Sequence, residues 1–148
     1  MTVKEVELTE EILEQIISLS EAWEEENSCH GYQKNTLEDI EGNRVFIAVE
    51  GDLVIGYLFG HKKVTEKSTS VCPADTKYFE IEELYVKPSF RNCGVGKTLF
   101  RYVEREAAAE ADMIMLSTAT KNFRAILHFY IDELGMEFWN ARLFKKIR

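Results

Sequence analysis

The segment that most constrains the fold of this chain runs from Arg91 to Thr98 and lies between a strand pattern and a helix pattern. Its glycines, Gly94 and Gly96, allow the backbone to turn sharply and to approach a ligand closely. The amides that follow belong to the first turn of a helix, where the N–H donors are unpaired and the helix dipole favours anions. The segment therefore predicts a site for a phosphate or pyrophosphate group.

Two common phosphate-binding motifs do not fit this segment. Residues 96–98 match the end of a Walker A loop, but that motif needs a glycine at position 91, which is Arg91. The dinucleotide fingerprint needs a third glycine at position 99, which is Leu99. A nucleotide-hydrolysing switch is thus disfavoured, and the pattern that remains is Arg-x-x-Gly-x-Gly.

Hydrophobic periodicity predicts an α+β fold in a single domain over residues 1–148, with a mixed, mostly antiparallel sheet flanked by helices. Alternating or β-branched runs predict strands at residues 3–8, 44–50, 53–61, 78–86, 113–117 and 137–147. Helical spacing predicts a helix between Thr9 as N-cap and Asn27, and further helices at residues 36–41, 97–111 and 123–134, the last one ended by Gly135.

The order strand, Arg91-x-x-Gly94-x-Gly96, helix resembles the pyrophosphate loop of the GNAT superfamily of N-acetyltransferases. The acidic strand from Glu80 to Pro88 is similar to the strand before that loop, above all to the one in diamine acetyltransferases. The last helix carries a further pattern that resembles the family, consisting of Asn122, Ala125, Phe129, Tyr130, Leu134 and Gly135. The order of elements is similar over nearly the whole chain.

The resemblance implies that acetyl-CoA is the co-substrate and that an amine accepts the acetyl group. It implies a coenzyme site made of Leu84, Tyr85, Val86, Arg91, Asn92, Cys93, Gly94, Val95, Gly96, Lys97, Thr98 and Asn122. The backbone of the strand can pair with the pantetheine arm as an extra strand would. A helix N-cap is the alternative for Asn122, and Cys93 is expected to contribute only its backbone amide.

The reaction itself requires a base and an acid. An amine attacks a thioester only when neutral, and a lysine-like amine has a pKa of about 10.4, so a carboxylate is needed to take its proton. We predict Glu82 as this base and Glu80 as the second candidate; the two share a strand face, and the resemblance implies a base at one or other of these positions. Glu83 would point the opposite way, unless a bulge like that of the family turns it toward the acceptor. Tyr130 is predicted to protonate the leaving thiolate, with a core tyrosine as the alternative.

The acceptor is predicted to contact Trp23, Glu26, Tyr32 and Glu83. Carboxylates beside aromatic rings suit a cation, which favours a small di- or polycationic amine such as a polyamine or an aminoglycoside-like compound. A solvated helix end is the alternative for the acidic residues after Trp23. A protein N-terminal or lysine acetyltransferase and a catalytically silent acyl-CoA-binding module remain open as functions.

Composition excludes several other classes of protein. The net charge of −8 argues against a nucleic-acid partner, whose phosphates would be repelled. No apolar run is long enough to cross a bilayer, and the N-terminus has no signal-peptide core, so we expect a cytoplasmic protein without a membrane partner. Three cysteines without a CxxC pair, and three scattered histidines, predict no metal site. The resemblance also allows a homodimer.

Overall fold

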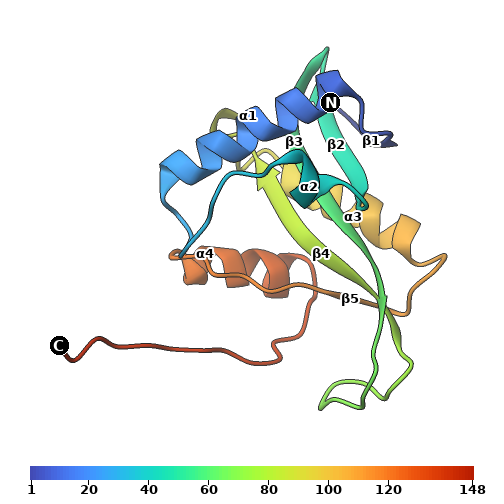
Figure 1. The fold of residues 1–148 in the computed structure, drawn as a ribbon, viewed down its shortest axis with the longest axis vertical. Helices are drawn as coiled ribbons and strands as arrows, with labels where there is room; N and C mark the ends of the chain where they lie inside the picture. Colours follow the sequence, from blue (N-terminus) through green and yellow to red (C-terminus); the bar gives the residue numbers. More distant parts are fainter.

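The computed structural model describes residues 1–148, and its centre is a five-stranded sheet in the order β1-β2-β3-β4-β5 (Figure 1). The first four strands pair antiparallel, and β5 runs parallel to β4. The strands are β1 (Thr2–Val6), β2 (Arg44–Glu50), β3 (Leu53–Val64), β4 (Lys77–Val86) and β5 (Met113–Met115); the α-helices are α1 (Glu10–Glu26), α2 (Leu37–Ile40), α3 (Val95–Ala107) and α4 (Phe123–Leu127). The predicted α+β fold with a mixed, mostly antiparallel sheet is confirmed.

The predicted signals for the first helix are present in the structure. The Thr9 hydroxyl accepts a hydrogen bond from the amide of Ile12 at 3.3 Å, and Glu10 and Glu11 occupy the first turn, where the helix dipole favours acidic side chains. Asn27 ends the helix in the left-handed conformation, with φ 52°. None of the helices is long and apolar enough to span a membrane.

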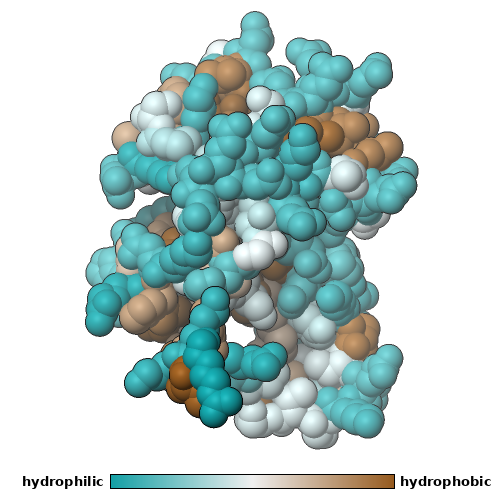
Figure 2. All heavy atoms as spheres, turned by 60° about the vertical axis from the view of Figure 1, so that its left-hand side comes forward, coloured by the Kyte–Doolittle hydropathy of each residue, from teal (hydrophilic) through white to brown (hydrophobic).

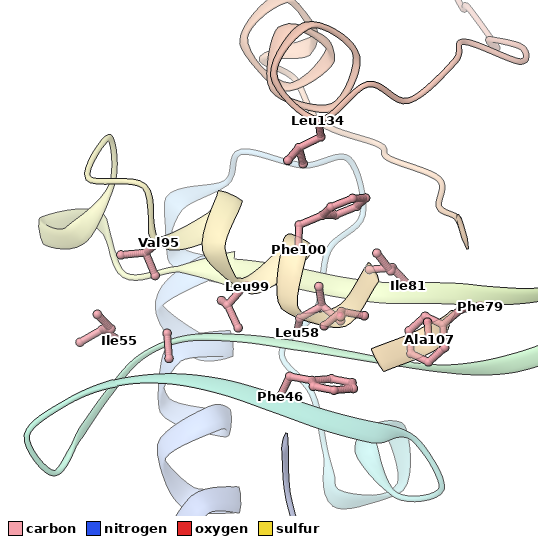
Figure 3. Close-up of a cluster of buried hydrophobic side chains, with 12 residues drawn as sticks. Phe46, Ile55, Leu58, Phe79, Ile81, Val95, Leu99, Phe100, Ala107 and Leu134 are labelled. Atoms are coloured by element: carbon pink, nitrogen blue, oxygen red, sulfur yellow. The ribbon is translucent and has the colours of Figure 1, made fainter. Parts of the chain in front are cut away.

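Two apolar layers cover the two faces of the sheet. Alternation along β2 sends Val45 and Ile47 toward the layer that contains α1 and α2, and Phe46 and Ala48 toward the layer that contains α3. Figure 3 shows the second layer, in which side chains of α3 lie between the strands and Leu134 at the end of the last helix. These layers fix α1 and α3 on opposite faces of β4, the strand that leads into the glycine loop.

A bulge interrupts the pairing of β3 with β4 at Glu82. Phe59 pairs with Glu83 and Gly60 pairs with Ile81, which leaves Glu82 without a partner. A Cβ atom at Gly60 would lie 2.1 Å from the Glu80 carbonyl oxygen, so only glycine permits this approach of the two strands. The bulge resets the alternation of side chains, so that Glu82 and Glu83 reach the same cleft instead of opposite faces.

The parallel pairing of β4 with β5 is short. It covers residues 78–80 of β4 and residues 113–115 of β5, and it ends before the bulge. Beyond that point β4 pairs only with β3. The backbone of Leu84–Val86 is therefore open on the side of β5.

The strand predicted at residues 137–147 is wrong. Residues 137–148 have no regular structure and make no backbone hydrogen bonds within the protein. The physical reason is that a strand needs a paired neighbour, which this segment lacks in its own chain. The predicted last helix is α-helical only through Leu127 and continues as wider π-helical turns over His128–Glu133. Gly135, with φ 76°, ends it as predicted.

Candidate active site

The glycine loop presents a row of backbone amides without acceptors. Gly94 is the N-cap of α3, and its φ of 82° is a left-handed conformation that favours glycine. The amides of residues 92–97 make no backbone hydrogen bond within the protein, and the first paired amide is that of Thr98, 3.0 Å from the Gly94 carbonyl oxygen. Unpaired donors at the N-terminus of a helix fit a pyrophosphate group.

The side chains around the loop leave this row open. Lys97 and Thr98 are exposed, and the Thr98 hydroxyl folds back to the Gly94 carbonyl oxygen at 2.8 Å. The Cys93 thiol also turns away, toward the Arg91 carbonyl oxygen at 3.3 Å. At Gly96 a Cβ atom would lie 3.3 Å from the ring of Phe129, so a side chain here would be crowded. The predicted coenzyme residues of the loop therefore form one continuous surface.

Arg91 binds protein groups rather than standing free beside the loop. Its Nη1 and Nη2 atoms donate to the two carboxylate oxygens of Glu26 at 2.6 and 2.9 Å, and its Nε donates to the Val86 carbonyl oxygen. The guanidinium also lies over the ring of Tyr85, whose hydroxyl donates to Glu26 at 2.6 Å. Burial acts to raise the pKa of Glu26, but these hydrogen bonds and the charge of Arg91 outweigh it and hold the pKa below its ordinary value.

An open cleft of about 290 Å³ lies between the α1–α2 connection, the bulged part of β4 and the segment after β5. The cleft is lined by Trp23, Cys29, His30, Gly31, Tyr32, Glu82, Glu83, Ser117, Thr118 and Ala119. Three of the four predicted acceptor residues, Trp23, Tyr32 and Glu83, thus come together. The fourth, Glu26, does not line the cleft and is bound to Arg91 instead.

Aromatic rings form the wall of the cleft on the side of α1. The rings of Trp23 and Tyr32 are stacked with their centroids 4.2 Å apart, and Trp23 also stacks on Tyr85 of β4 at 5.1 Å. The stack joins the acceptor side of the molecule to the strand that leads into the glycine loop.

Glu83 has one fixed and one open carboxylate oxygen. Its Oε1 accepts hydrogen bonds from the Tyr32 hydroxyl, the Tyr57 hydroxyl and the Asn35 side-chain amide, each at 2.9 Å. Its Oε2 has no partner, and since no buried side-chain oxygen in the structure lacks one, Oε2 is open to the cleft. Burial raises the pKa of Glu83, and the three hydrogen bonds offset only part of this rise.

The other two carboxylates of β4 have different surroundings. Glu82 is exposed and lies 3.7 Å from the Lys63 ammonium and 3.9 Å from the His61 ring. Glu80 does not line the cleft, and it pairs across the sheet with His61. Burial raises the pKa of Glu80, and the nearby charge of Glu82 adds to this effect.

Tyr130 is packed against the rings of Phe100 and Phe129. Burial, together with the charge of Cys29, raises the pKa of Tyr130 to about 12. Its hydroxyl has no hydrogen-bond partner within the protein, yet it is not sealed from solvent. Cys29 lines the cleft, whereas Tyr130 does not. Asn122 occupies the N-cap position of α4, but its side chain makes no capping hydrogen bond.

Sequence reasoning missed several residues of the site. The sequence analysis does not single out Ser20, Asn35 or Tyr57, yet the side chains of Asn35 and Tyr57 donate to Glu83. Ser20 accepts a hydrogen bond from the backbone amide of Asn35 at 2.8 Å. No local pattern marks these positions, because the residues meet only through the packing of α1 on β3 and β4. No group of three or more His, Cys, Asp or Glu side chains is close enough to hold a metal ion.

The antiparallel sheet that opens beside a glycine loop, the free amides at a helix N-terminus and the carboxylates in the adjoining cleft fit an enzyme that binds an acyl-coenzyme A. The chain belongs to the acetyltransferase (GNAT) family, whose model matches residues 11–136. It is an acetyltransferase that uses acetyl-CoA. This confirms the family and the co-substrate that the sequence predicts.

Solved structures share the fold over the whole chain. The aminoglycoside N-acetyltransferase AAC(6')-Iy in complex with CoA has 20% sequence identity and a TM-score of 0.68, with 99% of each chain covered. An aminoglycoside acetyltransferase from an uncultured soil metagenomic sample, in complex with sisomicin, has 20% identity and a TM-score of 0.65, with 99% of this chain and 97% of that chain covered. A mutant protein from Bacillus halodurans has 17% identity and a TM-score of 0.73, with both chains covered completely. No curated protein matches the sequence significantly.

Proposed function

We propose that the chain acetylates a small amine with two or more positive charges, by direct transfer from acetyl-CoA. The observation that carries the proposal is the pair of carboxylates, Glu82 and Glu83, in a cleft walled by the stacked rings of Trp23 and Tyr32. Carboxylates attract an ammonium group and ring faces can hold one. That solved neighbours include aminoglycoside acetyltransferases supports an acceptor of this kind.

In this proposal Glu83 takes a proton from the ammonium group of the acceptor, and the neutral amine that results attacks the thioester. Its open Oε2 faces the cleft, and its raised pKa brings it nearer to the pH at which a base works best. The three donors on Oε1 keep the carboxylate from turning away. Glu82, exposed and near Lys63, attracts a second ammonium group of the acceptor. The prediction of Glu82 as base remains the competing assignment.

The coenzyme side supplies the other half of the reaction. Acetyl-CoA brings the acetyl thioester, and the amides of residues 92–97 would hold its pyrophosphate. The open backbone of Leu84–Val86 would hold the pantetheine arm. Tyr130 would donate a proton to the departing thiolate, although its raised pKa makes the hydroxyl a weaker acid than an ordinary tyrosine.

A panel of amines, assayed for thiol release from acetyl-CoA, tests the proposed function. The panel contains polyamines, aminoglycosides, monoamines, amino acids and peptides with a free N-terminus or a lysine. We expect the highest kcat/KM for the polycationic small amines. Turnover of peptides alone would favour a protein acetyltransferase, and tight acetyl-CoA binding without turnover of any amine would favour a silent acyl-CoA-binding module; either result overturns the proposal.

A further inference from the structure

Polar side chains are rare in the interior of this protein. Figure 2 shows a face of the molecule on which hydrophilic residues form most of the surface. Apart from two tyrosines and one cysteine, the only buried side chains with polar atoms are Ser20 of α1 and Asn35, which precedes α2, at 0% and 7% exposure. A buried polar group is costly unless it is hydrogen-bonded. The partners of Ser20 and Asn35 therefore indicate the role of the two residues.

Both residues belong to one hydrogen-bonded group that ends at Glu83. The Ser20 hydroxyl lies 2.7 Å from the Tyr32 hydroxyl, and it accepts from the backbone amide of Asn35 at 2.8 Å and from the side-chain amide of Asn35 at 3.1 Å. The same side-chain amide donates to Oε1 of Glu83, and so do the hydroxyls of Tyr32 and Tyr57, each at 2.9 Å. The whole group thus leads to a single oxygen atom.

The hydrogen bonds of this group have one direction that satisfies every proton. Tyr32 has a single O–H, which it donates to Oε1 of Glu83. The hydrogen bond between Tyr32 and Ser20 must therefore be donated by the Ser20 hydroxyl. Ser20 in turn accepts from Asn35, whose N–H groups can only donate. Since every donor presents its hydrogen to Oε1, no acceptor remains there for a proton on that oxygen.

We propose that Ser20, Asn35 and Tyr57 are positioning residues that confine the proton of Glu83 to Oε2, the oxygen that is open to the cleft. The inference rests on the proposed assignment of Glu83 as the base. The ammonium group of the acceptor loses a proton to Oε2, which leaves a neutral amine and a neutral carboxyl group. Because no acceptor lies beside Oε1, the carboxyl group returns this proton to the cleft rather than through the protein.

The surroundings of Glu83 keep these donors in place. Burial raises the pKa of Tyr32 and of Tyr57, so both hydroxyls stay protonated and remain donors. Burial also raises the pKa of Glu83, and the charge of Asp39 in α2 adds to this rise, whereas the three donors oppose it. The other titratable side chains that line the cleft make no hydrogen bond to Glu83, namely Cys29, His30 and Glu82.

Titration of the Glu83 carboxyl group in the full chain tests the inference without recourse to activity. Carbon NMR follows the group, and the absence of its signal in Glu83→Gln identifies it. Tyr57→Phe removes one donor from Oε1 and keeps the ring stacked on Phe59. Because that donor stabilises the carboxylate, we expect the pKa of Glu83 to rise by about one unit in this variant. The rising limb of the pH–rate profile should move to higher pH by the same amount, with the high-pH plateau and the acceptor KM nearly unchanged.

Ser20→Ala tests the part of the group that does not touch Glu83. Loss of the hydroxyl leaves Tyr32 without a donor and the Asn35 amides without an acceptor, so we expect a smaller rise in the pKa of Glu83, roughly half a unit. Tyr102→Phe removes a hydroxyl from the α3 side of the sheet and is the matched control. It should change neither the pKa of Glu83 nor the limb. Circular dichroism verifies that each variant is folded.

The possible results separate this inference from the proposed function. An unchanged pKa of Glu83 in Tyr57→Phe would overturn the inference alone, because the donor would then not act on the carboxylate. A rate that falls by the same factor at every pH, with the limb in place, would also overturn it, because Tyr57 would then only pack. A pKa of Glu83 that rises while the limb stays would show that another group is the base. The proposed role of Glu83 would then be wrong, and the inference would fail with it.

Discussion

At the scale of single residues, Glu83 and Glu82 are neighbours in the chain and both line the cleft, but they differ in burial and in hydrogen bonding. Glu83 is largely buried and held by three donors on one oxygen, whereas Glu82 is exposed beside Lys63. A base that works near neutral pH benefits from a raised pKa, and burial raises the pKa of Glu83. This difference in surroundings makes the assignment of Glu83 as the base testable.

We expect Glu83→Gln to lower kcat/KM by about 10²- to 10⁴-fold, the usual contribution of a general base. Because the base must be deprotonated, the wild-type rate should rise with pH through a pKa above the ordinary carboxyl value, and this limb should vanish in the variant. Glu82→Gln makes the same change one residue away and should mainly raise the acceptor KM. A pH–rate profile in which Glu82→Gln loses the limb instead would assign the base to Glu82.

Removal of the Tyr130 hydroxyl tests the proposed acid. Tyr130→Phe keeps the ring against Phe100 and Phe129, so we expect turnover to fall by about 10- to 1000-fold with little change in the Kd of acetyl-CoA. Tyr102→Phe, which removes a hydroxyl from α3 outside the cleft, serves as the control. Steady-state kinetics and calorimetry measure the two quantities. Normal turnover of the Tyr130 variant would make Tyr130 a packing residue.

Some of the site residues can be predicted from the sequence, and others cannot. The acidic strand, the glycine loop and Tyr130 could be read from local patterns, because each has characteristic neighbours in the chain. That both Glu82 and Glu83 reach the cleft could not be predicted, because it depends on the bulge, and the bulge depends on how closely Gly60 of β3 approaches Glu80. The contact of Glu83 with Asn35 joins residues 48 positions apart, which no local pattern encodes.

At the scale of elements, Glu26 and Arg91 link the end of α1 to the glycine loop. Each terminal nitrogen of Arg91 donates one of its two N–H groups to Glu26, so Glu26 competes with a pyrophosphate for the Arg91 side chain. The pair is partly exposed, and such ion pairs contribute only about 0–1 kcal/mol. We therefore propose that Glu26 competes with the coenzyme for Arg91, while its predicted role as an acceptor-binding residue stays a prediction.

We expect Glu26→Gln to tighten acetyl-CoA binding by about threefold, the size set by a partly exposed ion pair, and to leave the acceptor KM nearly unchanged. Glu25→Gln removes the same charge from the neighbouring, exposed position and should change neither constant. Calorimetry with acetyl-CoA and steady-state kinetics with the best amine separate the two effects. An increase in the acceptor KM with unchanged acetyl-CoA affinity would instead support the role that the sequence predicts for Glu26.

A helix or strand was predicted well where all the residues that determine it lie within one continuous segment of the sequence. The helix from Glu10 to Glu26 has its cap, its acidic first turn and its apolar face in one continuous segment, and the structure agrees within a residue. Residues 137–148 also have a strand pattern, but pairing requires a second segment, and in the structure they pair with none. A strand pattern predicts the ability to pair rather than the pairing itself.

At the scale of the whole molecule, the charge of the chain and the proposed acceptor have opposite signs. The net charge is −8, and two of the acidic residues that contribute to it, Glu82 and Glu83, line the cleft. A polycation is therefore attracted before it makes any contact, and each of its charges adds to that attraction. An acceptor with a single ammonium experiences much less of it. The proposed acceptor class therefore predicts how the reaction depends on salt.

We expect the acceptor KM to rise with salt, and to rise more steeply for a triamine than for a monoamine of the same length. The Debye length falls from about 30 Å at 0.01 M to about 8 Å at 0.15 M, so salt removes the long-range attraction while leaving direct contacts in the cleft. The monoamine is the matched control, because it shares the shape and reacting group but not the extra charges. Initial rates at several salt concentrations, with saturating acetyl-CoA, give the two slopes. Equal slopes for the two amines would mean that charge does not select the acceptor, and the polycation proposal would then be wrong even if both amines are acetylated.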